Sequence, residues 1–141
     1  MTTVSTRPTR RAIGWGVGVG TGQAGLAFSF WWLDPVVVHA AMVVLIAAVY
    51  IGFAVSDGRM NVIVVESVIA SAFFIAASAA MAATPWLLVA LYLAHGAKDL
   101  WQHRFQFVRR TRWWPSFCLA VDVTAATIVA AQIALGARFQ A

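Results

Sequence analysis

Apolar residues fill five long runs of the chain, and short polar segments separate these runs. The runs occupy about residues 12–33, 35–55, 62–83, 85–102 and 115–137. Each approaches the roughly 20 residues that a helix needs to cross a bilayer. The pattern therefore predicts an all-α fold, an integral membrane bundle of about five transmembrane helices. We expect one membrane domain over residues 1–141, with residues 1–11 as a basic cytoplasmic tail.

Local signals mark where the runs begin. Asp34 and Thr84 each precede a proline, so each can cap a helix that has proline at its first position. A polar turn with glycine follows the second run, and Asn61 can cap the third helix. The first run holds six glycines between residues 14 and 25. Small residues permit close helix packing in membranes, which favours a packed span. A distorted or re-entrant segment is the alternative.

Arginines predict the orientation of the helices. They gather before the first run, between the second and third, and between the fourth and fifth, whereas only Arg138 follows the last. Five spans place all of these segments except that of Arg138 on one side, which the positive-inside rule assigns to the cytoplasm. We expect a multi-pass protein of the plasma (inner) membrane with its N-terminus in the cytoplasm and its C-terminus outside.

Composition agrees with a membrane protein. Apolar residues make up 62% of the chain and charged residues 11%, against about 25% charged residues in soluble domains. The formal net charge is +5, but the arginines lie at the ends of apolar runs, so nucleic-acid binding is not expected. The expected partners are the lipid bilayer and a lipophilic small molecule. A homo-oligomer or a larger membrane complex is compatible with the composition.

Ionisable residues interrupt the last three runs. His95, Asp99 and His103 recur every four residues, which places them on one face of a helix. Asp122 lies in the last run, four residues after Cys118, and Glu66 lies in the third. Charged groups inside a bilayer are costly, so they usually have a function. Helical rise places the carboxylates at similar depth in the cytoplasmic half, together with the phenol at position 50.

Acid/base chemistry is the leading interpretation of this set. A carboxylate in low dielectric holds a proton more readily, and a histidine one turn away can orient it or exchange that proton. We expect an enzyme that isomerises or cyclises an isoprenoid or other lipid. Asp99 or Asp122 is the expected proton donor and His95 its partner, while Glu66 and Tyr50 complete the catalytic set. This chemistry needs no cofactor.

Two other function classes remain open. A proton- or metal-coupled transporter or ion-binding protein would use the same groups, with Zn²⁺ or Fe²⁺ bound by members of a candidate set: His95, Asp99, His103 and Glu66. The second class is a non-catalytic subunit of a membrane complex.

Each polar residue also has a purely structural interpretation. Lys98 can snorkel to the interface, His103 can be a solvated interfacial histidine, and Asp99 can simply pair with Lys98 or a neighbouring group. Cys118 is expected to be a small buried residue. Gln23 and Gln132 are expected to form hydrogen bonds between helices.

The sequence from residue 50 onward resembles a family of small, uncharacterised bacterial polytopic membrane proteins. The resemblance rests on three motifs: YIGFA with DGR at 50–59, HGxxDxxxH at 95–103, and WPxFC with an aspartate at 114–122. It implies a helical membrane fold and singles out the same polar residues, but it implies no activity. Related proteins often carry two adjacent histidines where this chain has Gln102 and His103. Membrane-embedded terpene cyclases, small helical proteins with intramembrane acids, are a looser analogy.

Overall fold

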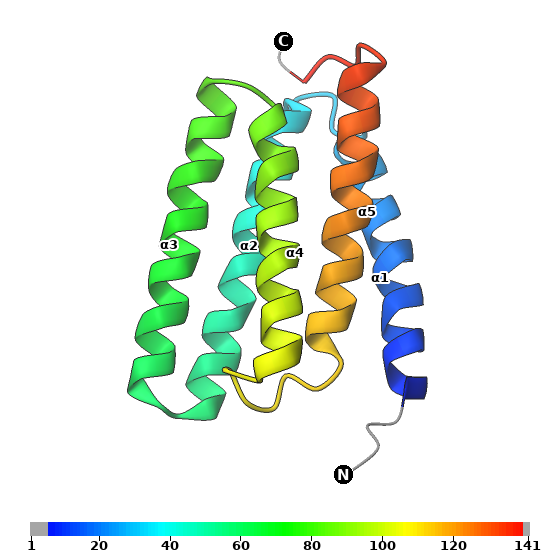
Figure 1. Cartoon of the computed structure of the whole chain (residues 1–141). Helices are drawn as coiled ribbons and strands as arrows, with labels where there is room; N and C mark the ends of the chain where they lie inside the picture. Colours follow the sequence, from blue (N-terminus) through cyan, green and yellow to red (C-terminus); the bar gives the residue numbers. More distant parts are fainter. Residues whose placement is uncertain (1–5, 140–141) are drawn as a thin grey trace.

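The computed structural model describes residues 6–139 and consists of five antiparallel helices joined by short connections (Figure 1). The helices are α1 (Thr6–Leu26), α2 (Pro35–Asp57), α3 (Met60–Ala82), α4 (Trp86–Phe105) and α5 (Trp114–Ala134). No strand occurs in the described part of the chain. The predicted all-helical fold and the number of helices are confirmed. The first helix begins and ends earlier than the predicted range of 12–33. Residues 6–11 of the predicted tail are therefore helical, and residues 1–5 lie outside the described part.

Three helices, α2, α3 and α5, are long and apolar enough to cross a membrane. The prediction of a membrane protein is thus supported. Of the five predicted spans, three meet the criteria of length and hydropathy. Glycines and three arginines lower the hydropathy of α1, and ionisable residues lower that of α4. Both helices still have 20 or 21 residues, which gives a length of about 30 Å at 1.5 Å per residue.

The packing order of the helices puts α4 in the middle. It lies against α5, α3 and α2, while α2 and α3 form a long antiparallel pair. The α1 helix packs mainly on α5. Apolar side chains fill one cluster toward the end where α2 begins, with Val43, Leu88 and Val129 at its centre. A smaller cluster around Val62 and Val108 closes the opposite end.

The contact between α1 and α5 depends on two glycines. A methyl group on Gly16 would lie 2.5 Å from the carbonyl oxygen of Phe117 and 2.7 Å from Cβ of Ala120. One on Gly20 would lie 2.8 Å from the carbonyl oxygen of Val121. Such distances exclude any side chain, so the small residues permit the close approach. The prediction of a packed helix holds, because α1 is a continuous helix rather than a distorted or re-entrant segment.

Helix ends follow the predicted turns but not all of the predicted caps. Asp34 precedes α2 without a side-chain cap bond, so that prediction is wrong. Asn61 lies inside α3, whose capping position is Arg59, and the prediction for Asn61 is also wrong. Thr84 does accept a hydrogen bond, from the backbone N–H of Trp86 at 3.4 Å. Gly58 ends α2 with φ 82°, a conformation that glycine adopts without strain.

An arginine links two connections at one end of the bundle. Arg59 donates to both carboxylate oxygens of Asp57, at 2.6 and 2.9 Å, and to the carbonyl oxygen of Phe107 at 2.6 Å. The backbone N–H of Arg109 donates to Asp57 at 2.7 Å. The hydrogen bond from Arg59 to Asp57 raises the pKa of the guanidinium. The α2–α3 turn is thereby tied to the connection between α4 and α5.

Candidate functional site

The α4 helix carries the polar face of the interior. Its buried residues Tyr92, His95, Asp99 and Gln102 recur every three or four positions, so they form one line along the side that faces the other helices. All four have a relative exposure of 1% or less. A helix whose polar groups point inward is the arrangement expected for ionisable residues in a membrane bundle.

The centre of this line is a contact between α4 and α5. Nδ1 of His95 lies 2.7 Å from Oδ2 of Asp122 and 3.3 Å from Oδ2 of Asp99. Ligand atoms of these three residues all lie within 4.8 Å of one another. One N–H at Nδ1 can donate well to only one of the two carboxylates, and the shorter distance favours Asp122. Gly96 packs against Asp122 at this point, and a methyl group there would make an ordinary van der Waals contact, 3.5 Å from Cβ of Asp122.

Tyr50 brings α2 into the centre. Its hydroxyl donates to Oδ1 of Asp99 at 2.5 Å, and both side chains are fully buried. The ring of Tyr50 also lies 6.0 Å from that of His95. Three helices therefore converge on one polar centre, formed by Tyr50, His95, Asp99 and Asp122. We call these four residues the acid–histidine centre.

A buried ion pair adjoins the centre. Nζ of Lys98 lies 2.9 Å from Oε2 of Glu66, with side-chain exposures of 9% and 0%. The geometry is that of an ion pair rather than an aligned hydrogen bond. The same ammonium lies 3.3 Å from the centroid of the Tyr50 ring, where the aromatic face attracts a cation. The expectation that Lys98 snorkels to the interface is wrong, because a carboxylate from α3 holds it inside.

The buried acidic groups outnumber their basic partners. Glu66, Asp99 and Asp122 are three carboxylates with no exposed surface. Among the described residues, only two basic groups, Lys98 and His95, contact them. If both are charged, one negative charge remains, and a buried unpaired charge costs several kcal/mol. Oδ1 of Asp122 has no hydrogen-bond partner among the described residues. At least one further proton or cation is therefore needed to balance the centre.

The structure brings together most of the predicted site residues. Tyr50, His95, Asp99 and Asp122 are in direct contact, and Glu66 joins them through Lys98. Of the predicted metal ligands, His95 and Asp99 belong to the compact group, whereas Glu66 and His103 do not.

Two further predicted residues lie apart from these contacts. His103 is exposed and lies 3.3 Å from Oγ of Ser116. It lies outside the compact group of His95, Asp99 and Asp122, and its exposed position agrees with the alternative of a solvated histidine. Cys118 is a buried free thiol one turn before Asp122, as expected for a small buried residue.

A second buried group of polar side chains was not predicted from the sequence. The hydroxyl of Tyr92 accepts a hydrogen bond from Nε2 of Gln23 at 2.7 Å and lies 3.0 Å from Nδ1 of His39. It links α1, α2 and α4 nearer to the end where α2 begins. Gln23 was predicted to bond between helices, which is confirmed. The spacing of three residues between Tyr92 and His95 was the signal that could have identified the group.

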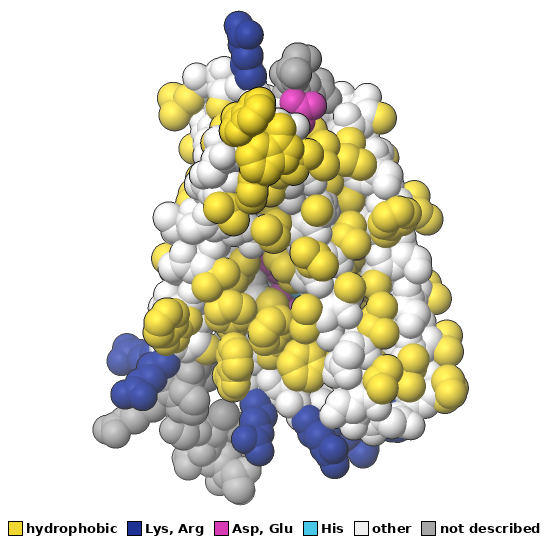
Figure 2. Space-filling view, turned by 180° about the vertical axis from the view of Figure 1, so that it is seen from behind, with side chains coloured by type: hydrophobic (Ala, Val, Ile, Leu, Met, Phe, Trp, Pro, Cys, Tyr) yellow, Lys and Arg dark blue, Asp and Glu magenta, His cyan; other side chains and the backbone are white. Residues whose placement is uncertain are grey.

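The face opposite the view of Figure 1 has a narrow hollow. Figure 2 shows it at mid-height between apolar side chains, with acidic side chains visible at its bottom. The three acids of the interior have no surface exposed to water, so the hollow narrows above them. The α1 and α2 helices that flank this side have little direct contact with each other.

Comparisons with protein-family models, with curated proteins and with solved structures find no match to this chain. The resemblance to small bacterial membrane proteins stays a prediction.

Proposed function

We propose that this chain is a membrane enzyme that performs acid/base chemistry on a lipophilic substrate, an isoprenoid or another lipid. The observation that carries the proposal is the excess of buried carboxylates over basic partners in and beside the acid–histidine centre. Unless a cation balances the charge, a group of three buried carboxylates with two basic partners holds at least one additional proton. A positioned acid of this kind is the equipment for protonating a double bond or an epoxide.

The residues would divide the work as follows. Asp122 and Asp99 share the exchangeable proton, and either one delivers it. His95 fixes the position of Asp122 from 2.7 Å and returns the proton. Tyr50 orients Asp99 through its 2.5 Å hydrogen bond. The pair of Glu66 and Lys98 sets the local field beside the Tyr50 ring.

The substrate would approach from the bilayer. The hollow of Figure 2 is bordered by apolar side chains and leads toward acidic groups, which suits a hydrocarbon chain better than a polar metabolite. Five spans fit this arrangement, with α4 placed so that its polar face is inside. The arginine-rich end of the bundle, which holds the start of α1 and the connection between α4 and α5, would face the cytoplasm.

Lipid profiling tests the proposal. Membrane extracts of cells that express the wild type, Asp122→Asn or Asp99→Asn are compared by chromatography with mass spectrometry, at matched levels of membrane protein. A lipid isomer present with the wild type and absent with both variants supports the enzyme. Asp34→Asn is the matched control, because Asp34 lies at the start of α2 outside the centre. Identical lipid profiles for the wild type and both variants would contradict the proposal.

Cation binding is the second candidate function, and one observation favours it. His95, Asp99 and Asp122 present three ligand atoms within 4.8 Å of one another, the number of protein ligands in an open zinc site. A metal-binding or metal-coupled transport protein would use them as its ion site. Elemental analysis of the purified chain distinguishes this function: stoichiometric zinc or iron that is lost in Asp122→Asn supports it. Metal below stoichiometry after dialysis against zinc or iron would rule it out.

A further inference from the structure

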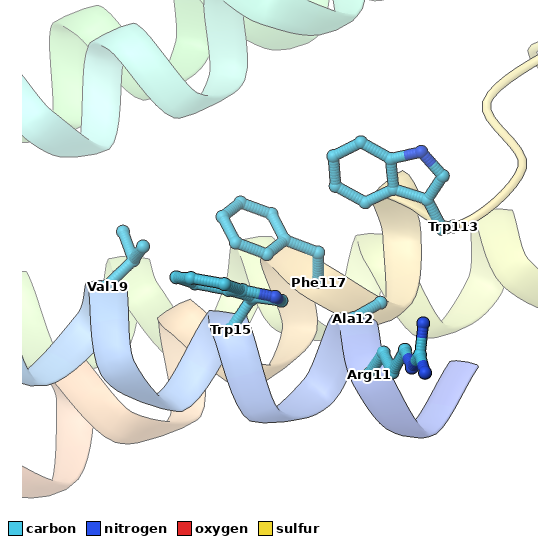
Figure 3. A pocket seen from close by; sticks show the side chains of 6 residues that line it. All are labelled: Arg11, Ala12, Trp15, Val19, Trp113 and Phe117. Carbon is cyan, nitrogen blue, oxygen red and sulfur yellow. The ribbon is translucent and has the colours of Figure 1, made fainter. Parts of the chain in front are cut away.

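A groove runs along the contact between α1 and α5, away from the acid–histidine centre. It has a volume of about 390 Å³ and six lining residues: Arg11, Ala12, Trp15, Val19, Trp113 and Phe117. Figure 3 shows that Trp15 and Val19 of α1 and the aromatic residues at the start of α5 project to the same side. We call this feature the α1–α5 groove.

The walls of the groove are held in a fixed position. Gly16 lies between Ala12 and Val19 in sequence but faces α5, where its approach to Phe117 leaves no room for a side chain. Gly20 repeats this contact one turn later. Because both glycines lock the register of the two helices, the groove between their side chains is part of the fold.

The lining is apolar along the groove and cationic at one end. Trp15 has 73% of its surface exposed, which is unusual for tryptophan in a helix unless lipid or a ligand covers it. Arg11 alone among the lining residues carries a charge. It lies at the arginine-rich end of the bundle, near the start of α1.

The groove is long enough to seat part of an extended hydrocarbon chain. Arg11 and Val19 are eight residues apart in a continuous helix, a separation of about 12 Å along its axis. A cation at the interface followed by an apolar path of this length complements a molecule with an anionic head and an apolar chain. Free phosphate would gain nothing from Trp15 and Phe117, and a zwitterionic lipid, whose headgroup cation offsets its phosphate, would gain less from Arg11 than an anionic lipid.

We propose that the α1–α5 groove binds an anionic phospholipid of the surrounding bilayer. Its phosphate pairs with Arg11, and one acyl chain lies against Trp15, Phe117 and Val19. This site is independent of the proposed catalytic function, because none of its residues belongs to the acid–histidine centre.

Lipid retention by the full chain tests the proposal. The protein is placed in nanodiscs that contain equal amounts of phosphatidylglycerol and phosphatidylcholine with identical acyl chains, and native mass spectrometry then counts the retained lipids. The expected result is a preference for phosphatidylglycerol of about fivefold, since one arginine near a membrane surface contributes about 1 kcal/mol. Arg11→Gln should bring the ratio close to one. Arg10→Gln is the matched control, because Arg10 is exposed beside the groove and does not line it.

A second variant tests the apolar part. Val19→Trp should fill the groove and reduce retention of both lipids, whereas Val68→Trp, on an exposed position of α3, should not. Equal retention of the two lipids by the wild type would overturn the proposal. So would an equal loss in Arg10→Gln and Arg11→Gln, which would indicate general surface attraction. Unchanged retention in Val19→Trp would exclude the groove as the site. Arg11→Gln keeps the test decisive if Val19→Trp fails to fold.

Discussion

His95 and Asp122, which are 27 positions apart in the sequence, meet at 2.7 Å inside the bundle and join α4 to α5. Neither side chain has more than 1% of its surface exposed. Nε2 of the same histidine has no hydrogen-bond partner among the described residues, so the ring has one nitrogen fixed and one free. A ring held in this way can orient an acid without losing its own capacity to take up a proton.

Removing the Tyr50 hydroxyl should destabilise the fold, because Asp99 loses a buried hydrogen-bond donor. Tyr50→Phe keeps the ring beside Lys98 but leaves Oδ1 of Asp99 without its 2.5 Å donor. We expect a loss of about 1–3 kcal/mol in the free energy of unfolding, as for a buried acceptor that loses its partner. Denaturation in detergent measures it. Val49→Ala, on an exposed face of the same helix, is the control, and an equal loss in both variants would refute the effect.

The ion pair of Glu66 and Lys98 should show strong coupling. Lys98→Met leaves a buried carboxylate alone, which should cost about 3–5 kcal/mol. Glu66→Gln combined with Lys98→Met should recover most of that loss, because no unpaired charge remains. A double-mutant cycle on unfolding free energies measures the coupling. Additive effects of the two substitutions would show that the pair does not interact.

The glycines of α1 offer a matched comparison. Gly16→Ala should destabilise the protein by about 1–3 kcal/mol, because the new methyl group forces α1 away from α5. Gly18→Ala should be neutral or stabilising, since nothing lies within 4 Å of the added methyl group and alanine favours a helix. Thermal unfolding of the two variants tests the contact. Equal melting temperatures would mean that α1 does not pack on α5 through this face.

The contacts of Arg59 with Asp57 and Phe107 should limit local unfolding of the connection between α4 and α5. Arg59→Lys loses the two-pronged contact with Asp57 and the bond to the carbonyl of Phe107. We expect faster hydrogen exchange at backbone amides of residues 105–113, with the helices unchanged. Arg104→Lys is the control, because Arg104 is exposed. Unchanged exchange in this segment would mean that the Arg59 contacts do not hold the connection in place.

Much of the fold was predictable because continuous apolar runs of about 20 residues are typical of helices that cross a bilayer, whereas transmembrane strands are about half as long. Helical spacing also predicted that Asp99 and Asp122 lie at a similar height along the bundle, which led to their selection as site residues. Spacing does not give the rotation of one helix about another, so the contact of His95 with both acids could not be derived. The position of Lys98 was mispredicted for the same reason: its partner Glu66 comes from α3, 32 positions earlier. The missing cap at Asp34 shows that a residue type favoured at a helix start does not guarantee the bond.

Infrared spectroscopy of the purified chain tests the central claim, that the acid–histidine centre holds a proton on a carboxyl group. The measurement compares the carboxylic-acid C=O band of the wild type at pH 7 with the bands of Asp99→Asn and Asp122→Asn, with Asp34→Asn as the control. We predict a band in the wild type and the control that disappears or shifts in both centre variants. A spectrum with no carboxylic-acid band, or one that neither substitution changes, would contradict the claim.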